Sequence, residues 1–324
     1  MNRNILIGIM LVVLVLSVFV AQSQYQSNPN TVRIAYLPVV QALPLYVAIE
    51  KGYFGDEGIE VEAVKIDSPN LIIDALISGQ VDMGSPSTAS GITAISQHRN
   101  PGTLKIFAAN GGTPPDNVDN LLLVRSDSDI QDIRDLEGKS VGILPGIQFR
   151  TIAKHILASE GIDPEKVELI DLAIPLQLQA LESGQVDALL TLEPVGTIGR
   201  GQGTTRDLVD GPMVRYIADP WYGGVGVVTA SFMAEDPELA SKAIAVFDRA
   251  IQDIKEDPDD ARQFLKGYTA LTDELIQEVP LPVWKMHDEF EQPDIDALQD
   301  FFDIFFHFGV IEERVTVQEL LYSP

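Results

Sequence analysis

Hydrophobic and polar residues follow the same order in two segments of the chain. In the first segment the pattern predicts strands at 32–36, 58–66 and 81–84, separated by helices at 44–52 and 71–79. The predicted strands are short apolar or alternating runs, whereas apolar residues in the helices recur three or four positions apart. The predicted order is therefore strand, helix, strand, helix, strand.

The second segment repeats this order. Strands are predicted at 140–143, 166–172 and 186–192, with helices at 150–161 and 176–184 between them. Strands that alternate with helices form parallel sheets, because each helix carries the chain back across the sheet. The two segments therefore predict an α/β protein with one parallel sheet in each of two lobes.

A nearly identical stretch marks the same point in both copies. Ala75–Asp82 and Ala180–Asp187 differ at a single position. The apolar residues of this stretch, with Leu71 and Leu176 upstream, fall on one face of a predicted helix. Its glycine suits the left-handed conformation that ends a helix, and its valine begins the next strand. We interpret the stretch as a feature of the scaffold.

Two further strands enclose the second copy. One is predicted at 121–125 and the other at 222–232, and together they are what a two-strand hinge requires. We therefore divide the chain into a first lobe (31–125), a second lobe (126–222) and a return to the first lobe with C-terminal helices (223–324).

An aromatic cluster lies in the last predicted helix. Its spacing is that of one helical face, which favours packing in the core over a ligand-binding box. The cluster comprises Phe301, Phe302, Phe305, Phe306 and Phe308.

Composition narrows the classes of function. A net charge of −26 over 324 residues argues against nucleic acid and anionic membrane surfaces as partners, since few cations are available to neutralise phosphates. The chain contains no cysteine, which excludes disulfides, thiolate zinc sites and cysteine nucleophiles. Its four histidines show no ligand spacing, so neither a metal site nor a cofactor is expected.

The N-terminal segment 1–23 differs from the rest. Arg3 precedes an unbroken apolar run, Ile5–Ala21, and small residues follow it. This pattern predicts a secretory signal peptide cleaved after Ser23, with an uncleaved membrane anchor as the alternative. In either case we expect the remaining chain to work in the periplasm or on the outer face of the cytoplasmic membrane.

Two glutamines occupy equivalent loops of the two copies. In open α/β sheets, ligands bind beyond the carboxyl ends of the strands. The first strand of each copy leads into such a loop, Leu37–Gln41 in one and Leu144–Gln148 in the other. We therefore predict that Gln41 and Gln148 hold a ligand from opposite lobes.

Predicted helix N-termini supply further candidates. Free N–H groups and the helix dipole attract an anionic or polar group there, although N-capping alone explains the hydroxyl residues equally well. Arg150 is the one cation in these loops; it either clamps an oxyanion or faces solvent. The candidates are Ser85, Ser87 and Thr88 after one strand and Phe149, Arg150 and Thr151 after another.

Four residues near the expected hinge and strand ends complete the candidate site. Asn110 precedes the hinge, and Trp221 and Tyr222 offer an aromatic wall for a small organic ligand or for the interlobe contact. Glu193 precedes a proline, which favours a fixed turn residue over a catalytic base. No catalytic motif is present: there is no GxSxG elbow, P-loop or strand-associated GxGxxG.

Several stretches resemble the nitrate/sulfonate/taurine group of ABC-transporter substrate-binding proteins, which includes the NMT1/THI5-like proteins. They include "VRIAYLPVVQALPLYVAIEKGYFGDEGIEVE", "ALISGQVDMGSPS", "DLEGKSVGI" and "AEDPELASKAI". The resemblance implies a type II periplasmic-binding-protein fold, with two lobes joined by a two-strand hinge that close around a small ligand. It implies a pocket at Gln41, Ser85, Ser87, Gln148 and Arg150.

The resemblance also implies a function and a partner. A monomeric protein of this kind captures a nitrate-, sulfonate- or taurine-like ligand and delivers it to an ABC permease. A thiamine-precursor-type pyrimidine or another heterocycle is the alternative ligand. A sensory ectodomain and a pyrimidine-forming enzyme are the remaining alternatives. The enzymes of the wider family resemble this chain less, because they need a cysteine-rich motif and a donor histidine.

Overall fold

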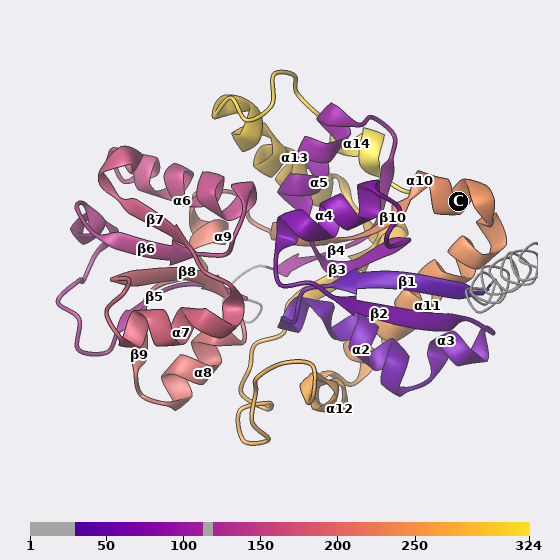
Figure 1. The fold of residues 1–324 in the computed structure, drawn as a ribbon, viewed down its shortest axis with the longest axis horizontal. Helices are drawn as coiled ribbons and strands as arrows, with labels where there is room; N and C mark the ends of the chain where they lie inside the picture. The colour runs from indigo at the N-terminus through magenta and orange to yellow at the C-terminus, as the bar shows by residue number, and fades with distance from the viewer. Residues whose placement is uncertain (1–29, 113–118) are drawn as a thin grey trace, which may run out of the picture.

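The computed structural model describes residues 30–112 and 119–324 and consists of two mixed sheets covered by helices (Figure 1). The first sheet has the order β11-β4-β10-β3-β1-β2. Its strands are β1 (Thr31–Tyr36), β2 (Glu60–Lys65), β3 (Met83–Ala89), β4 (Leu104–Gly112), β10 (Trp221–Thr229) and β11 (Val283–Met286).

The second sheet has the order β7-β6-β8-β5-β9. It contains β5 (Asn120–Arg125), β6 (Ser140–Ile143), β7 (Glu168–Asp171), β8 (Ala188–Leu192) and β9 (Thr205–Asp210). In Figure 1, α6 (Ile147–Ser159) and α9 (Pro212–Tyr216) lie on one face of this sheet, and α7 (Ile174–Glu182) and α8 (Val195–Gly201) on the other.

Helices also cover both faces of the first sheet. One apolar cluster joins the sheet to α4, α5 and α13 and continues into α6, and a second joins it to α2 and α11. The helices are α2 (Leu43–Glu50), α3 (Tyr53–Asp56), α4 (Pro69–Ile77), α5 (Ser90–Arg99), α10 (Ala230–Glu235), α11 (Pro237–Glu256), α12 (Pro258–Arg262), α13 (Gln292–His307) and α14 (Val317–Leu320). Short 3-10 turns are η1 (Val40–Ala42), η2 (Ile133–Leu136), η3 (Pro164–Lys166), η4 (Gln263–Leu265) and η5 (His287–Glu289).

The twofold pattern in the sequence is confirmed. β1 pairs in parallel with β2 and β3, with α2 and α4 in the connections. In the second sheet β6 pairs in parallel with β7 and β8, with α6 and α7 in the connections. Both copies therefore fold as β-α-β-α-β units.

The repeated stretch serves the scaffold in both copies. Gly79 and Gly184 adopt φ values of 71° and 74°, the left-handed conformation that ends α4 and α7. Asp82 then accepts a hydrogen bond from the backbone N–H of Arg33 at 2.8 Å, and Asp187 accepts one from the N–H of Ser140 at 2.8 Å. Each aspartate thus ties the start of one strand to its parallel neighbour.

The helix faces around this stretch differ from the prediction. Leu71 and Leu176 were expected on the buried face, but they are 56% and 54% exposed. Both stand in the first turn of their helix, where other positions are buried instead: Pro69 and Ile72 in α4 and Gln177 in α7. Ala75 and Ala180 in the later turns are buried, as predicted.

The strands that enclose the second copy each belong to one sheet. β5 pairs with β8 and β9, so it lies in the second sheet, although the predicted first-lobe segment 31–125 includes it. β10 pairs with β3 and β4 and begins at Trp221, inside the predicted second-lobe segment 126–222. The exact lobe boundaries, including the return segment 223–324, and the two-strand hinge stay predictions.

The aromatic cluster of α13 is largely core. Phe301, Phe302 and Phe305 are at most 1% exposed, as predicted, whereas Phe306 and Phe308 are 41% and 39% exposed. An amphipathic helix hides only one stripe, and Phe306 lies outside it, whereas Phe308 follows the end of α13. Among the described residues, no helix is long and apolar enough to span a bilayer. The predicted leader or anchor, 1–23, lies outside the described residues.

Candidate ligand-binding site

A buried cavity lies between the two sheets, at the carboxyl ends of parallel strands. The centres of water molecules can reach only about 30 Å³ of it, which is room for one or two waters. The first sheet and its connections contribute Leu37, Val39, Gln41, Ser87, Asn110 and Trp221, and the second contributes Asp119, Leu144, Gln148, Phe149, Leu192 and Met213. In this conformation the cavity therefore has no room for an organic ligand.

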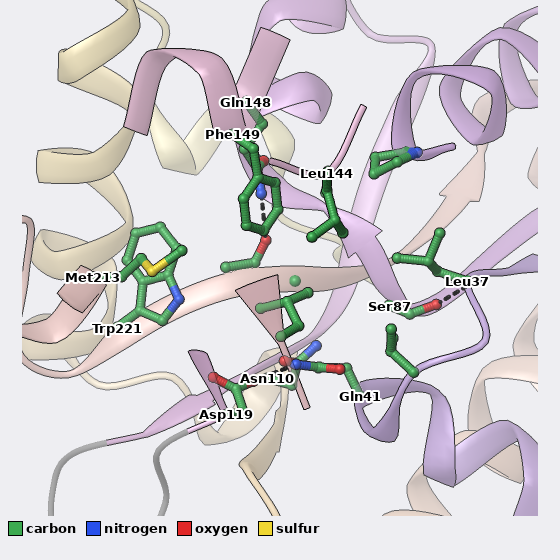
Figure 2. Close-up of a pocket in the computed structure, with 16 residues that line it drawn as sticks. Leu37, Gln41, Ser87, Asn110, Asp119, Leu144, Gln148, Phe149, Met213 and Trp221 are labelled. Carbon is green, nitrogen blue, oxygen red and sulfur yellow. Dashed lines mark hydrogen bonds between the residues drawn. The ribbon is translucent and has the colours of Figure 1, made fainter. Parts of the chain in front are cut away.

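Figure 2 shows polar and apolar groups on both sides of the cavity. Gln148, Phe149 and Leu144 lie on one side of this view, and Gln41, Asn110 and Asp119 on the other. The apolar groups shield the polar ones from water, which strengthens any hydrogen bond made there.

Gln41 is buried in η1 and reaches across to the second sheet. Its Nε2 donates a hydrogen bond to Oδ2 of Asp119 at 2.7 Å, while its Oε1 is buried without a partner. Its backbone carbonyl accepts a hydrogen bond from Nε1 of Trp284 at 3.0 Å. The position of the side chain is therefore fixed from two directions.

Asp119 was missed by reasoning from sequence. It precedes β5, is 3% exposed, and accepts a second hydrogen bond from Nδ2 of Asn120 at 3.1 Å. Burial raises the pKa of this carboxyl group, and the hydrogen bonds from Asn120 and Gln41 counteract the rise only in part. An acidic residue before an apolar strand was the only local signal, and Asp82 and Asp187 share it without reaching the cavity.

Gln148 also crosses between the two sides, from the first turn of α6. Its Oε1 accepts a hydrogen bond from the N–H of Gly91 in α5 at 2.8 Å, and its Nε2 donates to the carbonyl of Gly223 at 3.2 Å. The predicted pair Gln41 and Gln148 thus comes together at one cavity, and each side chain bonds to the opposite side.

The hydroxyl residues of β3 differ from the prediction. Ser85, Ser87 and Thr88 were expected to begin a helix, but they lie in β3, and α5 begins at Ser90. Antiparallel pairing with β10 extends the strand through these residues. Of the three, only Ser87 lines the cavity, and its Oγ accepts a hydrogen bond from the N–H of Leu37 at 3.0 Å.

Arg150 does not reach the cavity. Its guanidinium group donates to Oδ1 of Asp171 at 2.8 Å and to the carbonyl of Leu169 at 3.3 Å, both in β7. The neighbouring Thr151 is buried but does not line the cavity, whereas Phe149 does. Successive residues of a helix point in different directions, so Phe149 faces the cavity while Arg150 faces β7. The oxyanion clamp at Arg150 stays a prediction.

Glu193 holds a turn. Its carboxylate accepts hydrogen bonds from Nη2 of Arg200 at 2.6 Å and from the N–H of Thr197 at 2.9 Å. Burial raises the pKa of Glu193, and the charge of Arg200 opposes the rise. The fixed-turn interpretation fits these contacts, and Glu193 does not line the cavity.

Of the three remaining candidates, two line the cavity and one does not. Asn110 lines the cavity and donates a hydrogen bond to the carbonyl of Pro86. Trp221 also lines the cavity, with its ring edge-on to Phe301 at 4.4 Å between centroids. Tyr222 points elsewhere, because its hydroxyl donates to Oδ1 of Asp294 at 2.5 Å.

The arrangement supports binding. The cavity lining contains no lysine, arginine or histidine. No group of three or more histidine, aspartate or glutamate side chains in the described part of the chain could hold a metal ion. Amide, hydroxyl and carboxylate groups converge on a space walled by aromatic and aliphatic side chains, which is typical of a small-molecule site.

Two α/β units that face each other across a cavity are the architecture of periplasmic binding proteins. The alkanesulfonate-binding protein SsuA of Xanthomonas axonopodis pv. citri, solved with bound MOPS, matches this structure with a TM-score of 0.74 at 18% identity. The match covers 91% of this chain and 99% of that chain. The predicted fold class is confirmed.

The chain belongs to the NMT1/THI5-like family, whose model matches residues 40–261. A Bacillus subtilis protein named for binding aliphatic sulfonates is 24% identical over 286 residues, 86% of this chain and 82% of that protein. A 4-amino-5-hydroxymethyl-2-methylpyrimidine phosphate synthase of Saccharomyces cerevisiae, THI13, is 22% identical over 268 residues, 78% of this chain and 68% of that protein. Binding proteins and synthases are thus both among its relatives.

Proposed function

We propose that the protein is the extracytoplasmic solute-binding component of an ABC importer. The observation that carries this proposal is the buried cavity between the two sheets, lined from both sides and without a nucleophile–base pair. Likeness to the sulfonate-binding relatives supports it. The protein captures a small polar or anionic ligand, such as a sulfonate or nitrate, and passes it as a monomer to a membrane permease.

Closure of the two lobes is the proposed mechanism. In the closed form Gln41 bonds to Asp119 and Gln148 bonds to Gly91 and Gly223, each across the cavity. A ligand that bridges both sides favours this form by its differential affinity for it. We propose that Gln41 and Gln148 clamp the ligand from opposite lobes.

A heterocyclic ligand is the second candidate. It is favoured by the absence of a cation from the cavity lining and by the aromatic groups of Trp221 and Phe149. The pyrimidine synthase among the relatives is consistent with a pyrimidine-sized ligand. We propose binding without catalysis, since the chain has no cysteine for the motif expected of the family's enzymes.

The proposed site of action is outside the cytoplasmic membrane. The leader or anchor predicted at 1–23 would export the chain. Fractionation of cells that produce the full chain, followed by N-terminal sequencing of the mature protein, distinguishes cleavage after Ser23 from retention as an anchor.

A thermal-shift panel tests the function. It contains nitrate, alkanesulfonates, 2-aminoethanesulfonate, carboxylates and pyrimidines. A compound that binds only the folded state at 100 times its dissociation constant stabilises that state by about 2.7 kcal/mol, so at least one class is expected to raise Tm by several degrees. A panel in which no compound changes Tm contradicts the proposal.

Gln148→Ala is expected to open the ligand-free protein. Loss of its two hydrogen bonds removes about 1–3 kcal/mol from the closed form, roughly a five-fold to 150-fold change in the open-to-closed ratio. Small-angle X-ray scattering should show a larger radius of gyration. Gln177→Ala is the matched control, because Gln177 is equally buried but bonds to Leu172 and Thr191 within the second sheet and its connections. Equal radii for the two variants would rule out a closing role for Gln148.

A further inference from the structure

One side of the cavity presents a buried carboxylate paired with neutral donors only, and beside it a buried amide oxygen without a donor. Asp119 carries the only charge in the lining, and Gln41 adds an Oε1 atom that is buried and unpartnered. An unmatched buried acceptor costs free energy, because it has lost its hydrogen bonds to water. The Asp119 carboxylate and Oε1 of Gln41 belong to neighbouring side chains, which points to a ligand that donates hydrogen bonds to both.

The orientation of the Gln41 amide follows from its neighbour. A carboxylate accepts hydrogen bonds and cannot donate them, so the amide nitrogen must face Asp119 at 2.7 Å. The amide oxygen therefore points away from the carboxylate and can accept a hydrogen bond from a ligand. If the amide rotated, its oxygen would face the carboxylate, and two acceptors would repel each other. Rotation therefore cannot provide Oε1 with a hydrogen-bond donor.

Within residues 30–112 and 119–324, no cation compensates Asp119. Its side chain meets amides only, those of Gln41 and Asn120, and its backbone carbonyl accepts from the N–H of Glu193 at 2.8 Å. The nearby Glu193 carboxylate is directed at Arg200, whose guanidinium group is shared between Glu193 and Asp207. The carboxylate of Asp119 is thus buried with two neutral donors, and this burial raises its pKa.

We propose that the ligand carries an amino or protonated nitrogen whose N–H groups bind Asp119 and the Oε1 atom of Gln41. This rests on the proposed solute-binding function and specifies its ligand class. Two sources share this chemistry: an alkylammonium group, as in an aminosulfonate, and an amino group on an aromatic ring, as in an aminopyrimidine. Phe149, Leu144 and Trp221 wall the remaining space and would hold the rest of either molecule.

Two pairs of compounds test the proposal by calorimetric titration. One pair is 2-aminoethanesulfonate and ethanesulfonate, and the other is 4-amino-2-methylpyrimidine and 2-methylpyrimidine. The wild-type protein is expected to bind the amino member of one pair at least about 10-fold more tightly than its partner, and that pair identifies the source. Equal affinities within both pairs, or tighter binding of the compounds without the amino group, overturn the proposal but leave solute binding intact. Absence of any binding overturns both.

The Asp119→Asn variant supplies a second readout. It preserves the shape of the side chain and lets the Gln41 amide rotate to pair with it, so the protein should fold. The preference for the amino compound should fall at least about 10-fold, while Tm of the ligand-free protein should rise by about 2 °C or more because no charge is buried. Asp171→Asn, at the exposed partner of Arg150, is the control and should keep the preference. An undiminished preference in Asp119→Asn overturns the proposal.

The difference in Tm between Asp119→Asn and wild type should also depend on pH. A carboxyl group with a raised pKa in the folded state destabilises folding when ionised, and this effect disappears as pH falls through the raised value towards the ordinary value near 3.8. The Tm advantage of the variant should therefore be largest at neutral pH and shrink on acidification. An advantage that stays constant over this range would show that Asp119 is not buried as a charge.

Discussion

Phe305→Ala is expected to lower the free energy of unfolding by about 3–5 kcal/mol, the usual cost of removing a fully buried phenylalanine ring. Phe305 is 0% exposed in α13 and packs against Phe301 with 5.2 Å between ring centroids. A Cβ atom built on Gly91 would lie 2.4 Å from its ring, so the ring lies directly over this glycine. Because the N–H of Gly91 binds Gln148, the variant should also weaken closure.

Phe306→Ala is the matched control for Phe305. It removes the same ring from the next position of the same helix, where the side chain is 41% exposed. Its cost should be clearly smaller than that of Phe305→Ala, since a side chain that is 41% exposed buries less apolar surface and leaves no closed cavity. Urea unfolding followed by tryptophan fluorescence measures both variants. Equal losses would mean that α13 does not pack on the sheet as described.

Gly111→Ala is expected to destabilise the protein by about 3 kcal/mol or more, and to disturb the cavity. A Cβ atom at Gly111 would lie 1.6 Å from the carbonyl oxygen of Trp221, which is backbone and cannot rotate away. Gly111 pairs with Val283 of β11, so β4 is held on both sides at this point. Displacement of Trp221 should weaken binding of whichever compound the thermal-shift panel identifies.

Gly55→Ala provides the control for this substitution. Gly55 lies in α3, its φ is not positive, and a Cβ atom added to it would have no atom within 4 Å. Alanine there should be neutral or stabilise the protein by up to about 1 kcal/mol, because alanine favours the helix. Circular dichroism melting compares the two variants. A Gly111→Ala protein as stable as Gly55→Ala would show that β4 and β10 approach less closely than described.

Much of the fold could be predicted because its signals are local. The β-α-β-α-β order, the left-handed glycines Gly79 and Gly184 and the N-cap Asp236 of α11 each depend on a few neighbouring residues. The pairing of β5 with the second sheet could not be predicted in this way. Strand partners are chosen by hydrogen bonds between distant segments, and the sequence of β5 does not identify β8 and β9, which flank it in the second sheet.

The candidate site likewise contains residues whose placement could be predicted from the sequence and residues whose placement could not. Gln41 and Gln148 could be found because the internal repeat places them at equivalent strand ends. Arg150 in α6 was expected at the cavity because its partner, Asp171 at the end of β7, is 21 positions away along the chain. Ser85 and Thr88 were misplaced because pairing with a later strand extended β3 through them. In each case the deciding contact lies outside the local sequence window.

The sequence by itself determined the two copies, the parallel β-α-β-α-β unit of each and the family resemblance, since hydrophobic periodicity and helix ends act over one or two turns of chain. The predicted all-parallel sheets were wrong, because antiparallel strands from elsewhere in the chain complete both sheets. Only the tertiary structure decided which polar groups meet in the cavity. Gln41 and Asp119 are 78 positions apart and become partners only when the two sheets face each other. In the folded protein Asp119 is buried and has no cationic partner among the described residues. Its solvation and its pKa are therefore set by residues that surround it in space and not by its neighbours along the chain.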